Sequence, residues 1–295
     1  MERLSEEKWS GYAAWIAGVA RWALEEEVRT TPKPGLVDLG SNGAHLDMNA
    51  ALFLKSAEAL ESYFAQAAWM GMSLNVSPEA LFTLLRRWGK WAEREMYTAT
   101  GDVNTHKGAI FTMGVFCAAI GRCVHDGNMD MESIRTLEQQ MVSKQLQREL
   151  ETLSQREAIT YGEKNYCRYG SRGIRGAAIN GYSEVFEEAL PILKEGKRQN
   201  KDWNRVKLQV LITLMSRIED SNIIARRDLP TLKAVQQNMR DFLAQGGAYQ
   251  ETAIEKLQRM DREFSRKNIS GGGSADLLAL TIFINRITEE LETKA

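Results

Sequence analysis

The stretch SEEKWSGYAAWIAGVARWALEEEV, residues 5–28, shows the pattern that decides the fold. Its apolar side chains recur every three or four residues, which is the spacing of one face of an α-helix. Eight further stretches repeat this spacing, and alternating strand patterns are nearly absent. We therefore expect an all-α fold, with further helices near residues 48–70, 77–97, 105–123, 178–195, 203–219, 228–245, 249–266 and 274–293.

The chain shows no sign of division into parts. Its 295 residues contain five prolines, no visible repeat and no Gly/Ser-rich linker. We therefore expect residues 1–295 to form a single compact multi-helix domain, with its site built from the loops between helices. Residues 143–176 are rich in Gln, Glu, Arg, Lys and Tyr. This segment predicts either an amphipathic helix followed by an active-site flap or a solvated surface excursion.

The overall composition excludes several classes of protein. Lys and Arg number 38 against 39 Asp and Glu, and this balance argues against a nucleic-acid-binding protein. Three cysteines without a CxxC spacing indicate neither a disulfide framework nor a zinc site. We see no secretory leader and no apolar stretch long enough to span a bilayer, so we expect no membrane partner and a reducing cytoplasm.

The first polar segment has the character of a functional loop. It reads TPKPGLVD at residues 31–38, followed by GSNGAHLD at residues 40–47. Proline fixes φ and glycine permits positive φ, so the backbone shape of this loop is strongly restricted. Rigid loops that carry polar groups are frequent sites of function. The polar groups that this one presents are Lys33, Asp38, Ser41, His45 and Asp47.

A second polar segment, NTHKGAIF at residues 104–111, precedes an apolar helix. Asn104 or Thr105 is expected to cap this helix, which places His106 and Lys107 in its first turn. Free backbone amides and a lysine at that position suit a phosphate group. The alternative is a capped helix with an exposed lysine and a packed histidine, and the spacing alone does not choose between the two.

Three more segments carry polar chemistry. ISGGGSADLL at residues 269–278 is expected to open a helix capped by Ser274, with Asp276 in the first turn, although it is not a Walker A loop. EDSN at residues 219–222 suits either Mg²⁺ or a turn. The glycine-rich segment at residues 161–176 supplies Arg175 for phosphate. For Asp276, stabilisation of the helix dipole is the competing explanation.

Together these segments resemble the triphosphoribosyl-dephospho-CoA synthase family. The resemblance rests on TPKPGLVD, GAHLDM, NTHKGAIF, GIRG, DSN and GGGSADLLA, and extends from about residue 25 to residue 290. It implies a transferase that moves the triphosphoribosyl group of ATP to the ribose 2′-hydroxyl of 3′-dephospho-CoA and releases adenine. It also implies that the product is the prosthetic-group precursor of citrate lyase or malonate decarboxylase, and that an acyl-carrier-subunit prosthetic-group transferase acts next.

Such a glycosyl transfer needs a base, a hydrogen-bond donor for adenine and cations near the triphosphate. With the resemblance, we expect catalytic roles for His45, Asp47, His106 and Asp220. We expect Mg²⁺ to be held by Asp47, Asp220 and Asp276. The residues expected to bind substrate are Lys33, Gly35, Asp38, Ser41, Asn104, Lys107, Arg175, Asn222, Gly272, Gly273 and Ser274.

Two other functions remain open on the residues alone. One is a Mg²⁺-dependent helical hydrolase of nucleotides or ADP-ribose, which would release phosphate instead of adenine. The other is a non-catalytic helical protein that binds a nucleotide or a carrier protein, against which the polar residues in all five segments argue.

Overall fold

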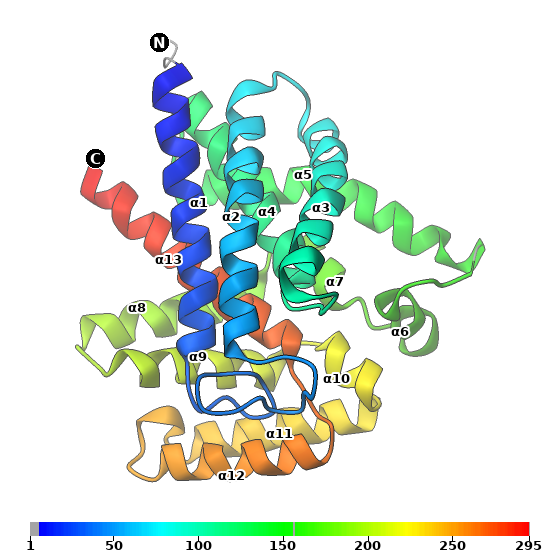
Figure 1. Ribbon diagram of the computed structural model, residues 1–295, viewed down its shortest axis with the longest axis vertical. Coiled ribbons are helices and arrows are strands. Elements are labelled where there is room, and N and C mark those ends of the chain that lie inside the picture. The colour runs from blue at the N-terminus through cyan, green and yellow to red at the C-terminus, as the bar shows by residue number, and fades with distance from the viewer. Residues whose placement is uncertain (1–5, 156, 295) are drawn as a thin grey trace.

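Two long helices, α1 (Glu6–Arg29) and α2 (Ala50–Ser73), pack side by side in the computed structural model, which describes residues 6–155 and 157–294 (Figure 1). Within these residues every regular element is helical, so the expected all-α fold is confirmed. The other α-helices are α3 (Pro78–Thr100), α4 (Lys107–Asp126), α5 (Met131–Glu151), α6 (Tyr161–Tyr169), α7 (Gly173–Ile179), α8 (Leu190–Arg198), α9 (Trp203–Arg217), α10 (Ser221–Arg226), α11 (Leu229–Ala244), α12 (Ala253–Arg266) and α13 (Gly272–Lys294). Short 3₁₀ turns η1 (Thr152–Gln155) and η3 (Gly247–Tyr249) and a π-helical segment η2 (Glu184–Ala189) complete the chain.

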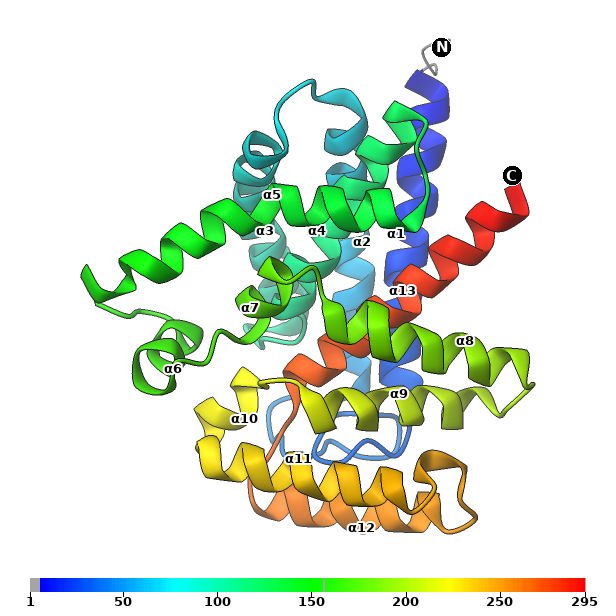
Figure 2. The ribbon, with the colours of Figure 1, turned by 180° about the vertical axis from the view of Figure 1, so that it is seen from behind.

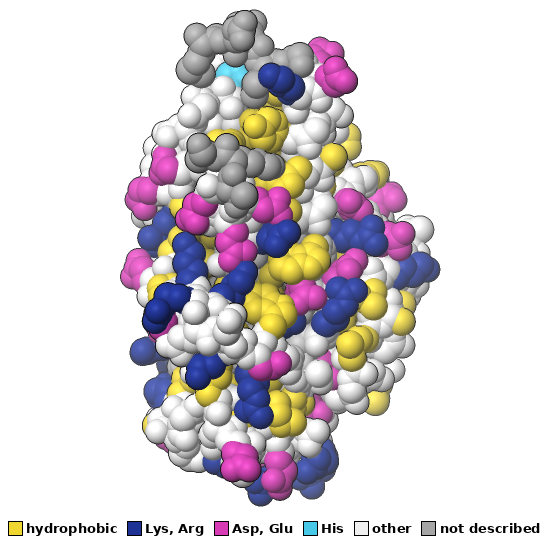
Figure 3. Space-filling model, turned by 90° about the vertical axis from the view of Figure 1, so that its left-hand side faces the viewer, with side chains coloured by type: hydrophobic (Ala, Val, Ile, Leu, Met, Phe, Trp, Pro, Cys, Tyr) yellow, Lys and Arg dark blue, Asp and Glu magenta, His cyan; other side chains and the backbone are white. Residues whose placement is uncertain are grey.

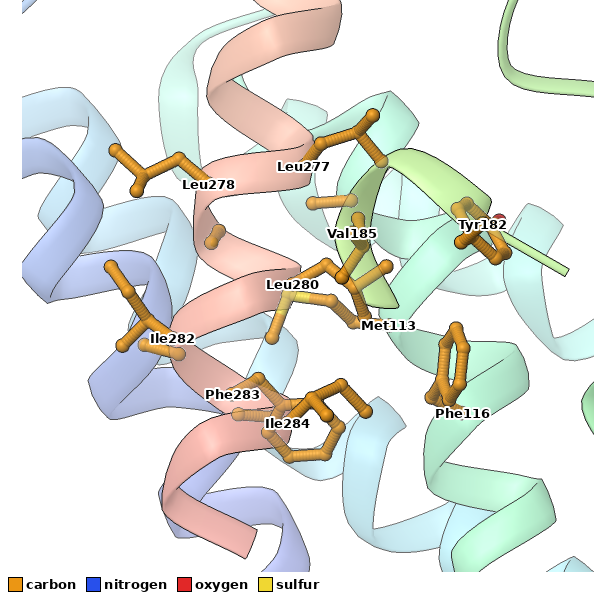
Figure 4. Packing of buried hydrophobic residues seen from close by; sticks show 14 of the residues in the cluster. Met113, Phe116, Tyr182, Val185, Leu277, Leu278, Leu280, Ile282, Phe283 and Ile284 are labelled. Carbon is orange, nitrogen blue, oxygen red and sulfur yellow. The ribbon is translucent and has the colours of Figure 1, made fainter. Parts of the chain in front are cut away.

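Helix α4 forms the centre of the hydrophobic core, where it contacts α1, α2, α3, α5 and α13. Figure 4 shows Met113 and Phe116 of α4 beside Val185, Tyr182 and the apolar side chains of α13. By length and composition α4 is apolar enough to cross a membrane, so the expectation that no such stretch exists is wrong. However, 78% of its apolar window is buried inside the fold, as expected of the core helix of a soluble protein.

Glycines allow α2 and α4 to approach until their backbones touch. A Cβ atom added at Gly71 would lie 2.0 Å from the carbonyl oxygen of Ala118. A Cβ atom added at Gly121 would lie 2.1 Å from the carbonyl oxygen of Ala68. The two glycines therefore set the distance between these helices, and with it the position of the loop that precedes α4.

The single helix predicted for residues 178–195 is wrong, because the chain breaks after α7. Gly181 and Tyr182 adopt left-handed φ values of +61° and +51°. Side chains of α5 stabilise this break: Arg135 Nε donates to the Gly181 carbonyl at 2.8 Å, and Gln139 Nε2 donates to the Ile179 carbonyl at 2.9 Å. The helix resumes as η2 and α8.

The polar segment 143–176 begins inside helix α5, as the first of its two alternatives expected, and the flap stays a prediction. Helix α5 begins earlier, at Met131, because Asp130 accepts a hydrogen bond from the amide of Ser133. After η1 the chain forms two short helices, α6 and α7. Thr160 and Glu163 form a reciprocal capping box that starts α6. Helices α5, α6 and α7 form an arm, and Figure 2 shows it leaving the body of the molecule along α5 and returning through α6 to α7.

The loop between α1 and α2 lies between the lower ends of these helices and the paired helices α11 and α12 (Figures 1 and 2). Helices α10 and α13 begin beside this loop. On the face shown in Figure 3, basic and acidic side chains are intermixed, and apolar side chains form separate spots among them. The fold thus gathers the polar loops at one end of the central helices.

The contact between α2 and α4 generates a stability prediction. Gly71→Ala should lower the free energy of unfolding by about 1–3 kcal/mol, because the added methyl group overlaps the facing backbone. Gly18→Ala is the matched control, since Gly18 lies within α1 and a Cβ atom there meets nothing within 4 Å. That variant should raise the free energy of unfolding by about 0.5–1 kcal/mol. Urea unfolding measures both, and equal stabilisation by both changes would contradict the close contact.

Candidate active site

The loop that follows α1 is held by a buried ion pair. Lys33 Nζ donates to the Glu27 carboxylate and, at 2.9 Å, to the Glu27 carbonyl oxygen. Both side chains are buried. Burial outweighs the attraction of Lys33 and raises the pKa of Glu27. The ammonium that the sequence suggested for phosphate therefore already has a protein partner, and Lys33 lines neither of the two cavities described below.

The rest of this loop is held by hydrogen bonds to Asp38 of the loop and to Asp261 of α12. Asp38 accepts hydrogen bonds from the amides of Lys33 at 2.8 Å and Ser41 at 2.9 Å. The Gly35 amide and the Ser41 hydroxyl donate to the two carboxylate oxygens of Asp261 on α12, at 2.9 and 2.8 Å. Gly35, Asp38 and Ser41 thus shape and anchor the loop, and they too lie outside the lining of the two cavities.

A cavity of about 300 Å³, here called the inner cavity, opens beside this loop. It is walled by the end of α1, the loop before α2, the start of α4, α10 and the start of α13. Its lining gathers residues from four of the five polar segments. Its polar residues are Glu27, His45, Asp47, Asn104, Thr105, His106, Lys107, Asn222, Arg226, Ser270 and Asp276, and Gly108 and Gly272 contribute backbone.

His45 is fixed in one tautomer by its neighbours. Arg226 Nη2 donates to His45 Nδ1 at 2.9 Å, so Nδ1 is an acceptor and Nε2 carries the proton. His45 Nε2 in turn lies 2.9 Å from Ser270 Oγ, to which it donates. Burial and the Arg226 charge lower the pKa of His45 to about 4. His45 is therefore a neutral hydrogen-bonding group at neutral pH.

His106 is the second histidine of the inner cavity, and it is buried. Its Nδ1 lies 2.8 Å from Ser56 Oγ, which also accepts a hydrogen bond from the Thr105 hydroxyl at 2.7 Å. Its Nε2 is buried without a hydrogen-bond partner. Burial and the Lys33 charge lower the pKa of His106 to about 3. A neutral ring with one unsatisfied nitrogen in a cavity is suited to a ligand.

Asp220 caps two helices at once. Its Oδ1 accepts from the Asn222 amide at 3.0 Å, and its Oδ2 accepts from the Ser274 amide at 2.8 Å and the Ser274 hydroxyl at 3.0 Å. The prediction that Ser274 itself caps α13 is wrong, since the cap comes from Asp220 across the fold and the helix begins at Gly272. Burial raises the pKa of Asp220, although these hydrogen bonds act in the opposite direction.

Asp276 faces the start of α4. A Cβ atom added at Gly108 would lie 1.9 Å from Asp276 Oδ2, so a side chain at this position would displace the Asp276 carboxylate. Burial and the nearby charges of Glu27 and Asp220 raise the pKa of Asp276 well above its usual value, while the amide of Ala109 opposes this shift. The anion position at the start of α4, which the sequence suggested for phosphate, thus lies against a carboxylate of the protein itself.

Lys107 and Asn104 complete the start of α4. Helix α4 begins at Lys107 and its N-cap residue is His106, which makes no side-chain cap hydrogen bond, so the prediction that Asn104 or Thr105 caps this helix with His106 in its first turn is wrong. Asn104 Oδ1 instead accepts a hydrogen bond from the Lys107 amide at 3.3 Å from the preceding loop. The half-exposed Lys107 Nζ lies 2.8 Å from Glu93 Oε2. This partner raises the pKa of Lys107, which keeps its positive charge at the edge of the cavity.

A second and larger cavity of about 560 Å³, here called the outer cleft, adjoins the inner cavity. It lies between α3, the start of α4 and the arm formed by α5, α6 and α7. It contains Arg175, which lies 3.6 Å from the Glu163 carboxylate, and Gly273. Both cavities share five lining residues, Asn104, Lys107, Gly108, Asn222 and Asp276. All five polar segments therefore meet around two adjoining cavities.

The three carboxylates predicted to hold Mg²⁺ occupy different surroundings. Asp47 is 66% exposed at the rim, with Oδ1 4.0 Å from His45 Nδ1. Asp220 is buried under its hydrogen bonds, and Asp276 faces α4. Among residues 6–155 and 157–294, no group of three or more His, Cys, Asp and Glu is arranged to hold a metal without other ligands. The Mg²⁺ site remains a prediction.

Glu27, Ser56 and Arg226 also belong to the site, although none of them was predicted from the sequence motifs. One signal for Glu27 was present, because three successive glutamates occupy the last turns of α1, where the helix dipole disfavours acidic groups. Such a run indicates that the acids have partners elsewhere in the fold. Ser56 lies on α2 and Arg226 on α10, with no local signal, and only the tertiary structure brings them to the histidines.

The two histidines generate a pH prediction. In the unfolded chain both rings gain protons near pH 6.5, whereas in the folded protein His45 does so only near pH 4 and His106 near pH 3. The unfolded state thus binds more protons between these values, and the histidines make stability fall as the pH drops from 7 to 5.

The test compares urea unfolding of the wild type with that of His45→Gln/His106→Gln between pH 5 and 7. In the wild type the free energy of unfolding should rise with pH more steeply than in the variant. The difference in slope should be up to about 1.4 kcal/mol per pH unit for each histidine removed. The buried carboxyl groups affect the pH dependence of stability in the opposite direction. Because both proteins contain the same carboxyl groups, their contribution cancels in the comparison. An unchanged slope would contradict neutral histidines in the site.

Comparison with known proteins identifies the family. The family described as ATP:dephospho-CoA triphosphoribosyl transferase matches residues 13–295. Proteins named 2-(5''-triphosphoribosyl)-3'-dephosphocoenzyme-A synthase from Escherichia fergusonii and Klebsiella pneumoniae are each 38% identical, over 275 and 273 residues. These alignments cover 92% of this chain in both cases, and 91% and 89% of the relatives. A probable synthase from Salmonella gallinarum is 37% identical over 293 residues, covering 96% of this chain and 95% of its own.

No solved structure matches the chain. The family match and the relatives span nearly its whole length, and the resemblance read from the polar segments is thereby confirmed. The chain belongs to the ATP:dephospho-CoA triphosphoribosyl transferase family.

Proposed function

We propose that this transferase moves the triphosphoribosyl group of ATP to the ribose 2′-hydroxyl of 3′-dephospho-CoA, and that the two substrates meet at Asp276. The observation that carries the proposal is the position of Asp276 in the lining of both adjoining cavities. A reaction between two large substrates requires two binding spaces with one common point. The two cavities supply this arrangement, and the family supplies the chemistry.

Asp276 has the properties of a general base. The acceptor oxygen attacks C1′ of the ATP ribose, the bond from C1′ to adenine breaks, and the 2′-hydroxyl proton needs an acceptor. Buried carboxylates with a raised pKa are stronger bases than exposed ones. The pKa of Asp276 is raised by burial and by the charges of Glu27 and Asp220. Asp276 therefore receives the proton in this proposal.

His106 is suited to hydrogen bond the departing adenine. Thr105 donates to Ser56 Oγ, and among the described contacts the Ser56 hydroxyl has His106 Nδ1 as its acceptor. This direction leaves the proton of the neutral ring on Nε2, the buried nitrogen without a partner. A donor already oriented toward the leaving base stabilises charge that develops as the bond breaks.

The cations and Asp47 at the rim are suited to a triphosphate with Mg²⁺. Magnesium in proteins usually binds one or two carboxylates together with substrate phosphates and waters. The exposed Asp47 carboxylate fits this pattern, and Lys107 and Arg226 add positive charge to the same cavity. Bound Mg²⁺ would neutralise part of the charge of the triphosphate. Asp47 would hold the ion together with the nucleotide.

The biological setting remains part of the proposal. The resemblance implies that the product serves citrate lyase or malonate decarboxylase, through a downstream prosthetic-group transferase that acts on the acyl carrier subunit. The proposed location is the cytoplasm. The core position of α4 is consistent with it.

The direct test is incubation of the protein with ATP, Mg²⁺ and dephospho-CoA, followed by chromatography. One adenine should appear for each dephospho-CoA consumed. Release of phosphate without adenine would support the hydrolase alternative instead. Binding of nucleotide without any turnover would support the non-catalytic alternative.

The role of Asp276 generates a kinetic prediction. Asp276→Asn should lower kcat by about 10²–10⁴-fold, because it removes the base. Its melting temperature should not fall, since the amide keeps the volume and removes repulsion with Glu27 and Asp220. Asp47→Asn is the matched control at the rim, and it should raise the Mg²⁺ concentration needed while approaching normal kcat at high Mg²⁺. A normal kcat for Asp276→Asn would exclude the proposed base.

A further inference from the structure

We infer that the outer cleft binds the diphosphate and pantetheine arm of the acceptor, and that ATP occupies the inner cavity. This inference rests on the proposed function, because it assigns the two substrates of that reaction to the two cavities. It goes further in naming the part of the molecule that each region of the cleft recognises. Three features of the outer cleft carry it: length, charge and exposed apolar side chains.

The length of the cleft is set by one wall, which follows α3. Phe82, Arg86, Glu93 and Tyr97 line it in this order from the outer end toward the inner cavity. Phe82 and Tyr97 are separated by 15 residues, which corresponds to about 22 Å at the α-helical rise of 1.5 Å per residue. This wall is long enough for an extended chain such as the pantetheine arm. A compact nucleoside would leave most of it uncovered.

Positive charge is available on the side of the cleft formed by α6 and α7, close to the residues that line both cavities. Arg172 and Arg175 lie at the start of α7, which adjoins Ser221, Asn222 and α10 in the lining. Arg172 is an exposed residue, and its side chain has no ion-pair partner in the described part of the chain. Arginine is well suited to phosphate because its planar fork donates two parallel hydrogen bonds.

Apolar side chains also line the outer cleft, and two of them are unusually exposed. Phe82, Leu146 and Leu150 form its outer floor. Ile159 is 78% exposed and Tyr161 is 73% exposed, and both line the cleft at the start of α6. Large apolar side chains in such exposed positions often mark a binding site. The gem-dimethyl group and methylenes of pantetheine are apolar partners of suitable size.

The order of these features matches the order of groups in dephospho-CoA. The ribose with the attacking 2′-hydroxyl belongs at Asp276, where the two cavities meet. The diphosphate follows next to the ribose in the molecule, and the arginines of α7 follow in the cleft. The pantetheine arm comes last, beside the apolar outer surface. ATP has no chain beyond its phosphates that would use that surface.

The experiment uses 4′-phosphopantetheine, which has the arm and one phosphate but no nucleoside. Isothermal titration should show that it binds the wild type in the presence of saturating ATP and is displaced by dephospho-CoA. Ile159→Ser/Tyr161→Ser should weaken the binding of 4′-phosphopantetheine and of dephospho-CoA by about tenfold, with ATP affinity unchanged. Arg172→Gln should weaken both ligands by a similar factor.

The matched control is Leu39→Ser, which removes another large apolar side chain, 58% exposed, outside both cavities. It should leave all three affinities unchanged. Displacement of 4′-phosphopantetheine by ATP, or loss of ATP affinity in the double variant, would overturn the assignment. These measurements need no turnover, so a protein that binds as inferred but releases no adenine would contradict the proposed function and not the binding site.

Discussion

The buried carboxylate of Asp220 is the contact on which the arrangement of the site most depends. One side chain accepts hydrogen bonds from the starts of both α10 and α13, which are far apart in the sequence. The same two helices carry Asn222, Arg226 and Asp276. Without this shared cap, the start of α13 would lose its acceptor and the positions of these groups would no longer be coupled. The helical core supports the site, but Asp220 aligns its parts.

The polar loops divide into groups that build the site and groups that face it. Lys33 with Glu27, and Asp38 with its own loop amides, have their hydrogen bonds satisfied inside the protein. His106, in contrast, keeps a buried nitrogen without a partner, and Asp276 faces both cavities. Polar groups that are satisfied internally stabilise a shape, whereas unsatisfied groups at a cavity are available to substrates. This distinction separates residues that the motifs alone present as equivalent.

Much of the fold could be predicted from the sequence, because helical periodicity and capping residues are local signals. The break at Gly181–Tyr182 was missed, since side chains of α5 stabilise it across the fold. The family could be recognised from the order of the polar segments. Two contacts could not be predicted. The ion pair of Lys33 with Glu27 depends on both side chains facing inward, and the Asp220 cap on α13 joins residues that are distant in the sequence. The roles of Ser56 and Arg226 could not be predicted either, because their contacts with the histidines form only in the tertiary structure.

In the proposed reaction the two substrates occupy two adjoining cavities and react beside Asp276. The most direct measurement is a crystal structure of Asp276→Asn with ATP, Mg²⁺ and dephospho-CoA bound together. We expect C1′ of ATP and the acceptor 2′-hydroxyl oxygen next to residue 276, with adenine near His106 and the pantetheine arm along α3. Both substrates bound with these two atoms far from residue 276, or the arm in the inner cavity, would contradict this arrangement.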